Sequence, residues 1–304
     1  MLEQPDVSVI TVTYDCREFV GPMLASLARA TRERSVEVIV VDNASRDGVV
    51  ELVRGEWPAV RVIEMGENAG FARANNRGIA SARGRYILLL NPDTVADDAA
   101  IASLAGFLDA EPRAGVVAPR LVGSDLRDQG TARAFPTPAA AIFGRRSLLT
   151  RLFPRNPWSR RYLSGRDRSD VMPFEVDWVS GAAMMVRREV IERVGGLDEK
   201  FFMHWEDADW CHRIKDAGYQ VFCLPAARIV HAEGGSRRGW PPRQLRSFHQ
   251  GAFRYYAKHH APQWWNPLRY IAAAGLGLRA ALLIARYHAT AAFTRRPART
   301  VEAR

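Results

Sequence analysis

Apolar residues in the first third of the chain come in short, unbroken runs separated by segments with helix-like spacing. The runs are rich in Val and Ile and do not alternate with polar residues, which predicts strands buried on both faces of a parallel sheet. They lie at Val7–Tyr14, Val36–Val41, Val60–Met65 and Arg85–Leu90. The intervening segments predict helices at Phe19–Ala30, at Gly48–Arg54 and, after a Gly- and Asn-rich stretch, through Ala82. This alternation predicts successive βαβ units.

The second part of the chain continues the pattern after one interruption. Residues from Val122 to Pro173 are rich in Arg, Pro, Ser and Gly, which predicts a long excursion from the sheet rather than a packed layer. Helices are expected at Ala99–Asp109, at Glu189–Val194 and from the acidic residues near position 206 to Ala217, and strands at Gly115–Leu121, Phe174–Val179, Ala182–Val186, Tyr219–Leu224 and Ala227–Val230. The expected fold class is therefore α/β, with a Rossmann-like, mostly parallel central sheet and helices on both faces.

The chain divides by charge near residue 236. Of 304 residues, 47% are hydrophobic and 25% charged, as in ordinary globular proteins, and the net charge is +10. From Ser236 onward there are thirteen Lys and Arg against the single Glu302, so this part carries about +12 and the remainder is close to neutral. We therefore expect a domain at 1–236 and a basic, helical C-terminal region at 237–304.

The C-terminal region predicts one long helix, Leu268–Phe293, preceded by Trp264 and Trp265. Leucines there alternate with arginines, which suits either an interfacial helix on an anionic membrane or a helix packed on the body with its arginines exposed. The arginines form no continuous stripe, so we do not expect a nucleic-acid partner. The N-terminus shows no signal-peptide pattern, and the three cysteines follow no metal-binding spacing, which favours a reducing compartment.

Polar residues follow the ends of several predicted strands, where ligands of open α/β sheets bind. An Asp at such a tip together with a distant His can hold a divalent cation and leave positions for diphosphate oxygens. A separate acidic cluster, Glu206, Asp207 and Asp209, is compatible with catalysis or simply with a helix N-terminus that favours negative charge. The residues at strand ends are Thr13, Tyr14, Asp42, Asn68, Asp93 and His231.

Taken together, these segments resemble the family 2 inverting glycosyltransferases of the GT-A fold, over about Val7 to Ser236. The similarity is greatest to rhamnosyltransferase-like and galactofuranosyltransferase-like members. The motifs that carry it are VITVTY at 9–14, VDNAS at 41–45, NAGFA at 68–72 with Asn75 and Asn76, LNPD at 90–93, VSGA at 179–182, FFMHWEDAD at 201–209, and His231 with GGS at 234–236.

The resemblance implies a role for each motif. The family's Asp-x-Asp motif is replaced by Asn91-Pro92-Asp93, so one carboxylate is missing, and Asp93 with His231 would bind Mn²⁺ or Mg²⁺. Asp207 would be the catalytic base, with Glu206 as its helper. The residues assigned to the nucleotide-sugar are Thr13, Tyr14, Asp42, Asn68, Arg73, Asn76, Asn91 and Asp93, and those on the acceptor side are Trp178, Ser180, Gly181 and Trp205.

The function that the resemblance implies is transfer of rhamnose or another deoxyhexose from a dTDP- or UDP-sugar to a glycan or lipid-linked acceptor of the cell envelope. The expected location is cytoplasmic, peripheral on the inner face of the plasma membrane. The absent acid at Asn91 keeps one alternative open: a nucleotide-sugar-binding or scaffold protein of the same fold that has lost catalysis.

Overall fold

The computed structural model describes residues 4–31, 34–136, 172–232 and 241–294, and the chain forms two compact units. The first contains Met1–Phe202 and Glu206–Ser236, and the second contains Met203–Trp205 and Arg237–Arg304. Most of the excursion expected at 122–173 lies outside the described residues.

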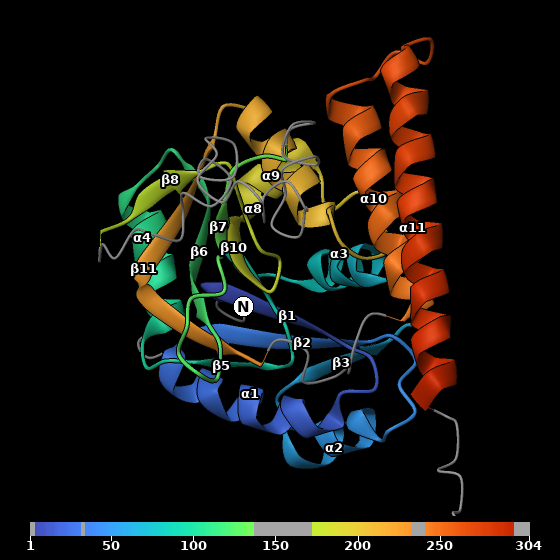
Figure 1. Cartoon of the computed structure of the whole chain (residues 1–304). Helices are drawn as coiled ribbons and strands as arrows, with labels where there is room; N and C mark the ends of the chain where they lie inside the picture. The colour runs from blue at the N-terminus through green and yellow to red at the C-terminus, as the bar shows by residue number, and fades with distance from the viewer. Residues whose placement is uncertain (1–3, 32–33, 137–171, 233–240, 295–304) are drawn as a thin grey trace, which may run out of the picture. The chain divides into compact units, whose positions relative to one another are not determined.

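The first unit is built on a nine-stranded sheet in the order β3-β2-β1-β4-β10-β6-β11-β5, with β8 also paired to β11 (Figure 1). A short pair, β7 and β9, lies off this sheet. The strands are β1 Val7–Thr13, β2 Val36–Asp42, β3 Arg61–Glu64, β4 Tyr86–Leu90, β5 Thr94–Ala96, β6 Ala114–Val122, β7 Ala132–Arg133, β8 Phe174–Val176, β9 Trp178–Val179, β10 Ala183–Arg187 and β11 Gln220–His231.

Strand direction divides the sheet into two parts. From β3 to β4 all strands are parallel, as the unbroken apolar runs predict. β10 is antiparallel to both of its neighbours, β4 and β6, and it joins the parallel part to the β6–β11 pair. Where two strands were expected at 219–230, the structure has the single strand β11, with a register shift between Leu224 and Arg228.

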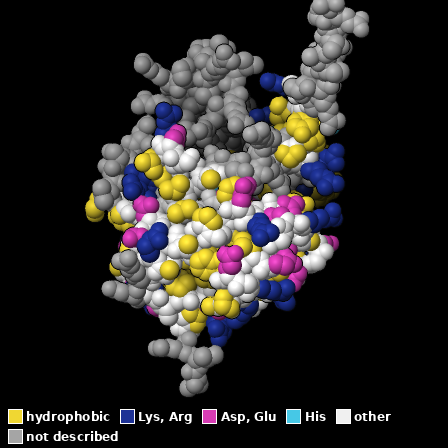
Figure 2. All heavy atoms as spheres, turned by 90° about the horizontal axis from the view of Figure 1, so that it is seen from below, with side chains coloured by type: hydrophobic (Ala, Val, Ile, Leu, Met, Phe, Trp, Pro, Cys, Tyr) yellow, Lys and Arg dark blue, Asp and Glu magenta, His cyan; other side chains and the backbone are white. Residues whose placement is uncertain are grey.

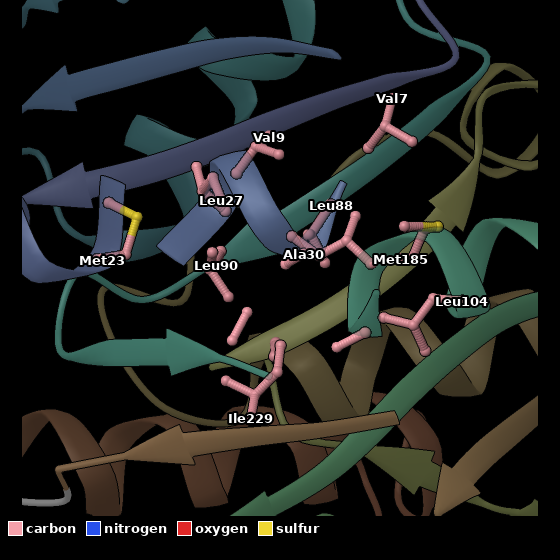
Figure 3. Packing of buried hydrophobic residues seen from close by; sticks show 14 of the residues in the cluster. Val7, Val9, Met23, Leu27, Ala30, Leu88, Leu90, Leu104, Met185 and Ile229 are labelled. Atoms are coloured by element: carbon pink, nitrogen blue, oxygen red, sulfur yellow. The ribbon is translucent and has the colours of Figure 1, made fainter. Parts of the chain in front are cut away.

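Helices cover both faces of the sheet, which confirms the expected α/β class. On one face, Leu27 of α1 and Leu104 of α4 pack against Val9 and Leu88 in one continuous core (Figure 3). On the other face, Gly78 of α3 lies so close that an added Cβ would come within 2.5 Å of Ile10. The helices of this unit are α1 Arg17–Ala30, α2 Val49–Glu56, α3 Phe71–Ser81, α4 Ala100–Ala110, α8 Arg188–Val194 and α9 Glu206–Asp216.

The face seen in Figure 2 carries acidic and basic side chains interspersed among apolar ones, without a single basic patch. The first unit has exposed ion pairs, such as Arg29 with Asp98 at 2.9 Å and Arg54 with Glu64 at 2.6 Å. Such exposed pairs contribute little to stability.

The second unit consists mainly of two helices, α10 Pro242–His259 and α11 Pro267–Thr294. The α10 helix also packs on residues 203–205: Ser247 donates a hydrogen bond to the Met203 carbonyl at 3.1 Å, and the ring of Phe248 lies 5.5 Å from that of Trp205. Within the described residues, α11 is the one helix long and apolar enough to cross a membrane by length and composition, over Pro267–Thr290.

Candidate active site

The ends of β1 and β2 place two predicted ligand residues side by side. Thr13 and Asp42 are partners in the parallel register, and Thr13 Oγ1 donates a hydrogen bond to Asp42 Oδ1 at 2.9 Å. Asp42 is buried, and its carboxylate also accepts from the backbone N–H of Ser45 at 3.0 Å and from the Ser45 hydroxyl. The carboxylate therefore orders the turn after β2. Tyr14 is half-buried beside it, and the predicted contact of these residues with a nucleotide base stays a prediction.

The loop before α3 packs closely against Phe202. Gly70 has φ +85°, and a Cβ there would lie 2.4 Å from the Phe202 carbonyl oxygen, which also accepts from Phe71 N–H at 2.7 Å. Only glycine combines this backbone conformation with so close an approach. Asn68 is exposed and its Oδ1 accepts from Gly70 N–H at 3.2 Å, while Asn43 Nδ2 donates to the Gly70 carbonyl at 3.2 Å.

The two other α3 residues predicted to face the nucleotide-sugar have protein partners. Arg73 is exposed and pairs with Glu67 at 3.3 Å. The Asn76 amide accepts from Leu197 N–H at 2.9 Å and donates to the Leu197 carbonyl at 2.8 Å. Asn76 therefore anchors the loop after α8, and a donor-binding role for it or for Arg73 stays a prediction.

Strands β5 and β11 bring the two predicted metal ligands together. Thr94 and His231 are partners in the antiparallel register, and Ala232 N–H donates to the Asp93 carbonyl at 2.9 Å. His231 Nε2 lies 3.3 Å from Asp93 Oδ1, and each side chain is 12% exposed. An imidazole nitrogen and a carboxylate oxygen thus meet at one partly accessible point, although 138 positions separate them in the sequence.

A second cluster forms where the segment between β9 and β10 meets α9. Asn91 N–H donates to the Ala182 carbonyl at 2.8 Å and so ties the tip of β4 to this segment. Gly181 N–H donates to Asp207 Oδ2 at 3.0 Å, and Ala208 N–H donates to Oδ1 at 2.8 Å. The Asp207 carboxylate is thereby fixed in orientation at the N-terminus of α9, where the helix dipole favours negative charge.

The electrostatics of Asp207 suit a proton acceptor. Burial raises the pKa of its carboxyl group, and the hydrogen bonds from Gly181 and Ala208 and the charge of Arg133 oppose that rise. A carboxylate with a raised pKa holds a proton more strongly, which is what a general base requires. Perturbed pKa values of this kind are common in active sites.

The rest of the acidic cluster supports the helix. Asp209 is fully buried and pairs with Arg213 of its own helix at 2.9 Å. Trp210 is also buried, and its Nε1 donates to the Gly195 carbonyl at 2.9 Å. Glu206 is 5% exposed. These contacts fix the helix that carries Asp207.

Two residues that the sequence analysis did not single out line a small pocket with Ser180 and His231: Gln129 and Arg133. The Arg133 charge acts on Asp207 and His231 contacts Asp93, so residues of this pocket neighbour both the predicted base and the predicted metal ligands. Both missed residues lie in the stretch interpreted as an excursion, and no motif marks them. Gln129 lies in the turn between β6 and β7, and Arg133 lies in β7, which pairs with β9.

The aromatic residues predicted on the acceptor side are packed into the protein. Trp178 is buried, its Nε1 donates to the Ala134 carbonyl at 2.9 Å, and the Arg133 guanidinium lies 4.9 Å from its ring centre. Trp205 belongs to the second unit and packs on Phe248 and Tyr255. Sugar stacking by either tryptophan stays a prediction.

The buried Cys16 lies within the electrostatic influence of both Asp42, a predicted nucleotide ligand, and Asp93, a predicted metal ligand. Burial, together with smaller contributions from the charges of Asp47, Asp93 and Asp42, raises the pKa of its thiol to about 12 against the opposing effect of a hydrogen bond to the Tyr14 backbone. The charges of Asp42 and Asp93 therefore both contribute to the pKa of Cys16. Its thiol stays protonated and is not a nucleophile at neutral pH.

Comparison with known proteins agrees with this arrangement. The model of the family "Glycosyl transferase family 2" matches residues 8–195. The N-acetylglucosaminyl-diphospho-decaprenol L-rhamnosyltransferase of Mycobacterium tuberculosis is 32% identical over 287 residues, which cover 91% of this chain and 92% of that protein. The low-salt glycan biosynthesis hexosyltransferase Agl10 of Haloferax volcanii is 26% identical over 233 residues, covering 74% of this chain and 67% of that protein.

Solved structures share the fold at lower identity. GalNAc-T7 with UDP, GalNAc and Mn²⁺ matches with a TM-score of 0.61 at 15% identity, covering 84% of this chain and 51% of that one. The mannosyltransferase PcManGT of Pyrobaculum calidifontis with GDP-Man and Mn²⁺ matches with a TM-score of 0.56 at 22% identity, covering 95% of this chain and 81% of that one. The architecture is thus that of the GT-A glycosyltransferases. Because the family model matches more than half of this chain, the chain belongs to glycosyltransferase family 2.

Proposed function

We propose that the protein transfers rhamnose, or another deoxyhexose, from a pyrimidine nucleoside-diphosphate sugar to a hydroxyl group of a lipid-linked cell-envelope acceptor, with inversion. The observation that carries the proposal is Asp207: a partly buried carboxylate with a raised pKa, oriented by two backbone N–H groups next to the pocket that contains His231. The name of the Mycobacterium tuberculosis relative supports the sugar and the acceptor class.

In this mechanism Asp207 accepts the proton of the acceptor hydroxyl while that oxygen attacks the anomeric carbon. The N–H groups of Gly181 and Ala208 hold the carboxylate at both oxygens, which keeps a lone pair directed at the acceptor without side-chain reorientation. The charge of Arg133 opposes the rise of the Asp207 pKa and so favours the ionised carboxylate. One displacement with one base inverts the anomeric centre.

The pair of Asp93 and His231 fits a divalent cation. One carboxylate oxygen and one imidazole nitrogen, 3.3 Å apart and partly accessible, are donors suited to Mn²⁺ or Mg²⁺. A metal held there supplies positive charge to the leaving diphosphate. With only one carboxylate in the Asn91-Pro92-Asp93 segment, we expect weaker metal binding than a site with two acids would have.

The test is a transfer assay with the purified full chain, a panel of dTDP- and UDP-sugars, Mn²⁺ or Mg²⁺, and an N-acetylglucosaminyl-diphospho-polyprenol acceptor. We expect transfer from dTDP-rhamnose above the other donors, and its loss on chelation of the metal. Transfer of a different sugar would refute the donor assignment. Binding of nucleotide-sugar without turnover on any acceptor would instead support the non-catalytic alternative.

We also propose that α11 binds the anionic surface of the membrane that holds the acceptor. Ile271, Leu278 and Leu282 are 65%, 64% and 63% exposed, and their spacings of seven and four residues place them on one helix face. Arg279 and Arg286 flank this face and can contact lipid phosphates. An apolar stripe beside basic residues is the pattern of an interfacial helix.

Vesicle flotation tests this part of the proposal. The wild-type chain should float with phosphatidylglycerol vesicles and much less with phosphatidylcholine vesicles. Replacing the exposed pair Trp264 and Trp265 by Ala should weaken flotation, since tryptophans anchor helices at the interface. Extraction by alkaline carbonate is expected for a surface-bound helix, whereas retention would indicate a spanning one. No flotation with either lipid would refute membrane binding.

A further inference from the structure

Gln129 contacts His231 at two points. Its Nε2 donates to the His231 backbone carbonyl at 2.7 Å, and its Oε1 lies 2.8 Å from His231 Nδ1. A carbonyl oxygen can only accept, so the NH₂ end of the amide must face it. The Oε1 end, which can also only accept, then faces the ring. His231 therefore carries a hydrogen on Nδ1.

This contact decides which ring nitrogen can bind a cation. In the neutral imidazole a hydrogen on Nδ1 leaves the lone pair on Nε2. Nε2 is the nitrogen that lies 3.3 Å from Asp93 Oδ1. Metal-binding histidines commonly donate their other N–H to an oxygen acceptor, which fixes tautomer and ring orientation. Gln129 occupies that acceptor position.

The hairpin between β6 and β7 holds Gln129 in place. The Gln129 backbone N–H donates to the Leu121 carbonyl at 3.0 Å, and Leu121 N–H donates to Thr131 Oγ1 at 2.7 Å. Val122 and Asp128 form an isolated antiparallel bridge beside it. The side chain thus projects from backbone that is bonded to the same sheet as His231, and its amide reaches the ring without a flexible loop between them.

We propose that Gln129 is a positioning residue that holds His231 in the tautomer able to bind a divalent cation through Nε2. This inference rests on the metal-dependent function proposed above and extends it to a residue outside every recognised motif. Gln129 acts through His231 and need not touch the metal or the substrate.

The first test is Mn²⁺ affinity of the full chain with dTDP present, measured by electron paramagnetic resonance. Gln129→Leu, which removes both contacts, should weaken Mn²⁺ binding by about 10- to 100-fold. Gln129→Glu keeps an oxygen acceptor for the Nδ1 hydrogen and should stay within about threefold of wild type. Gln220→Leu makes the same change at the opposite end of β11, where the side chain bonds Glu175, and should leave Mn²⁺ affinity unchanged.

The outcomes separate the two proposals. If the wild type binds Mn²⁺ and Gln129→Leu binds it equally well, the positioning role is wrong, whatever happens to the melting temperature. If the wild type does not bind Mn²⁺, the proposed metal site fails and this inference fails with it. A merely structural Gln129 would lower the melting temperature in the Leu and Glu variants without separating their metal affinities.

A second measurement needs no Gln129 variant. In ¹⁵N-histidine-labelled protein, with His231→Gln to assign the signal among the seven histidines, the neutral ring of His231 should show its hydrogen on Nδ1. Finding the hydrogen on Nε2 would overturn the inference.

Discussion

Replacing Asp207 by Asn should abolish most catalysis while leaving the fold intact. Asn has the shape of Asp but cannot accept a proton at neutral pH. The carboxylate accepts two backbone hydrogen bonds, from Gly181 at 3.0 Å and Ala208 at 2.8 Å, whereas the Asn side chain has one acceptor atom and keeps one of them. The substitution therefore removes the proposed base, one hydrogen bond and one partly buried ionisable group.

The expected sizes of these effects differ. Loss of general-base catalysis lowers kcat by about 10² to 10⁴-fold, or about 3 to 5 kcal/mol in the activation free energy. The lost hydrogen bond costs about 1 kcal/mol of stability. Because the folded-state pKa of Asp207 lies above its unfolded value, the protonated form stabilises the fold at low pH, and this contribution is lost as pH rises through the raised pKa. Asn has no charged form, so the substitution also removes the cost of ionising this group in the fold, which acts against the loss of the hydrogen bond.

The assay measures kcat at saturating donor and acceptor, together with thermal unfolding. Asp216→Asn, at the exposed end of the same helix, is the matched control and should change neither quantity. The wild-type kcat should also fall at low pH, through the raised pKa of Asp207. An Asp207→Asn variant with wild-type kcat would refute the assignment of the base. A large fall in melting temperature would show that its main contribution is to the fold.

Two further substitutions test other parts of the account. Arg133→Met removes a charge that lowers the Asp207 pKa, so the acidic limb of the kcat–pH profile should move to higher pH, and an unmoved limb would exclude this coupling. Gly70→Ala should lower the free energy of unfolding by about 1 to 3 kcal/mol, because its Cβ would lie 2.4 Å from the Phe202 carbonyl at φ +85°. Gly66→Ala is its control, with φ +74° and nothing within 4 Å, and chemical denaturation should show a clearly smaller loss.

Much of the fold could be predicted from the sequence, because parallel strands that are buried on both faces appear as unbroken runs of apolar residues. Val7–Thr13, Val36–Asp42 and Tyr86–Leu90 are buried strands close to their predicted bounds. The pairing of β10 between β4 and β6 could not be predicted. The hydrophobic pattern of a strand indicates that the strand is buried, but it does not indicate which strand it pairs with or whether the pairing is parallel. The pattern predicts two strands, Tyr219–Leu224 and Ala227–Val230, where the structure has the single strand β11 with a register shift between Leu224 and Arg228.

The site was predictable to the extent that it consists of motif residues at strand ends. Asp93 and His231 meet as expected because adjacent strands carry them to the same edge. Gln129 and Arg133 could not be found, because a lone Gln or Arg in a Pro- and Arg-rich stretch has no distinguishing spacing. Gln129 is placed by a local turn that the Val122–Asp128 bridge closes, and Arg133 by the pairing of β7 with the distant β9. The hydrophobic pattern reveals neither pairing.

The anomeric configuration of the product tests the central claim most directly. A single displacement assisted by Asp207 requires the transferred sugar to have the opposite anomeric configuration to that in the donor. Proton NMR of the glycosylated acceptor, formed by the wild-type enzyme and analysed before any further reaction, gives that configuration. We predict inversion. Retention would contradict a mechanism with one base and one displacement and would require a nucleophile that this account does not contain.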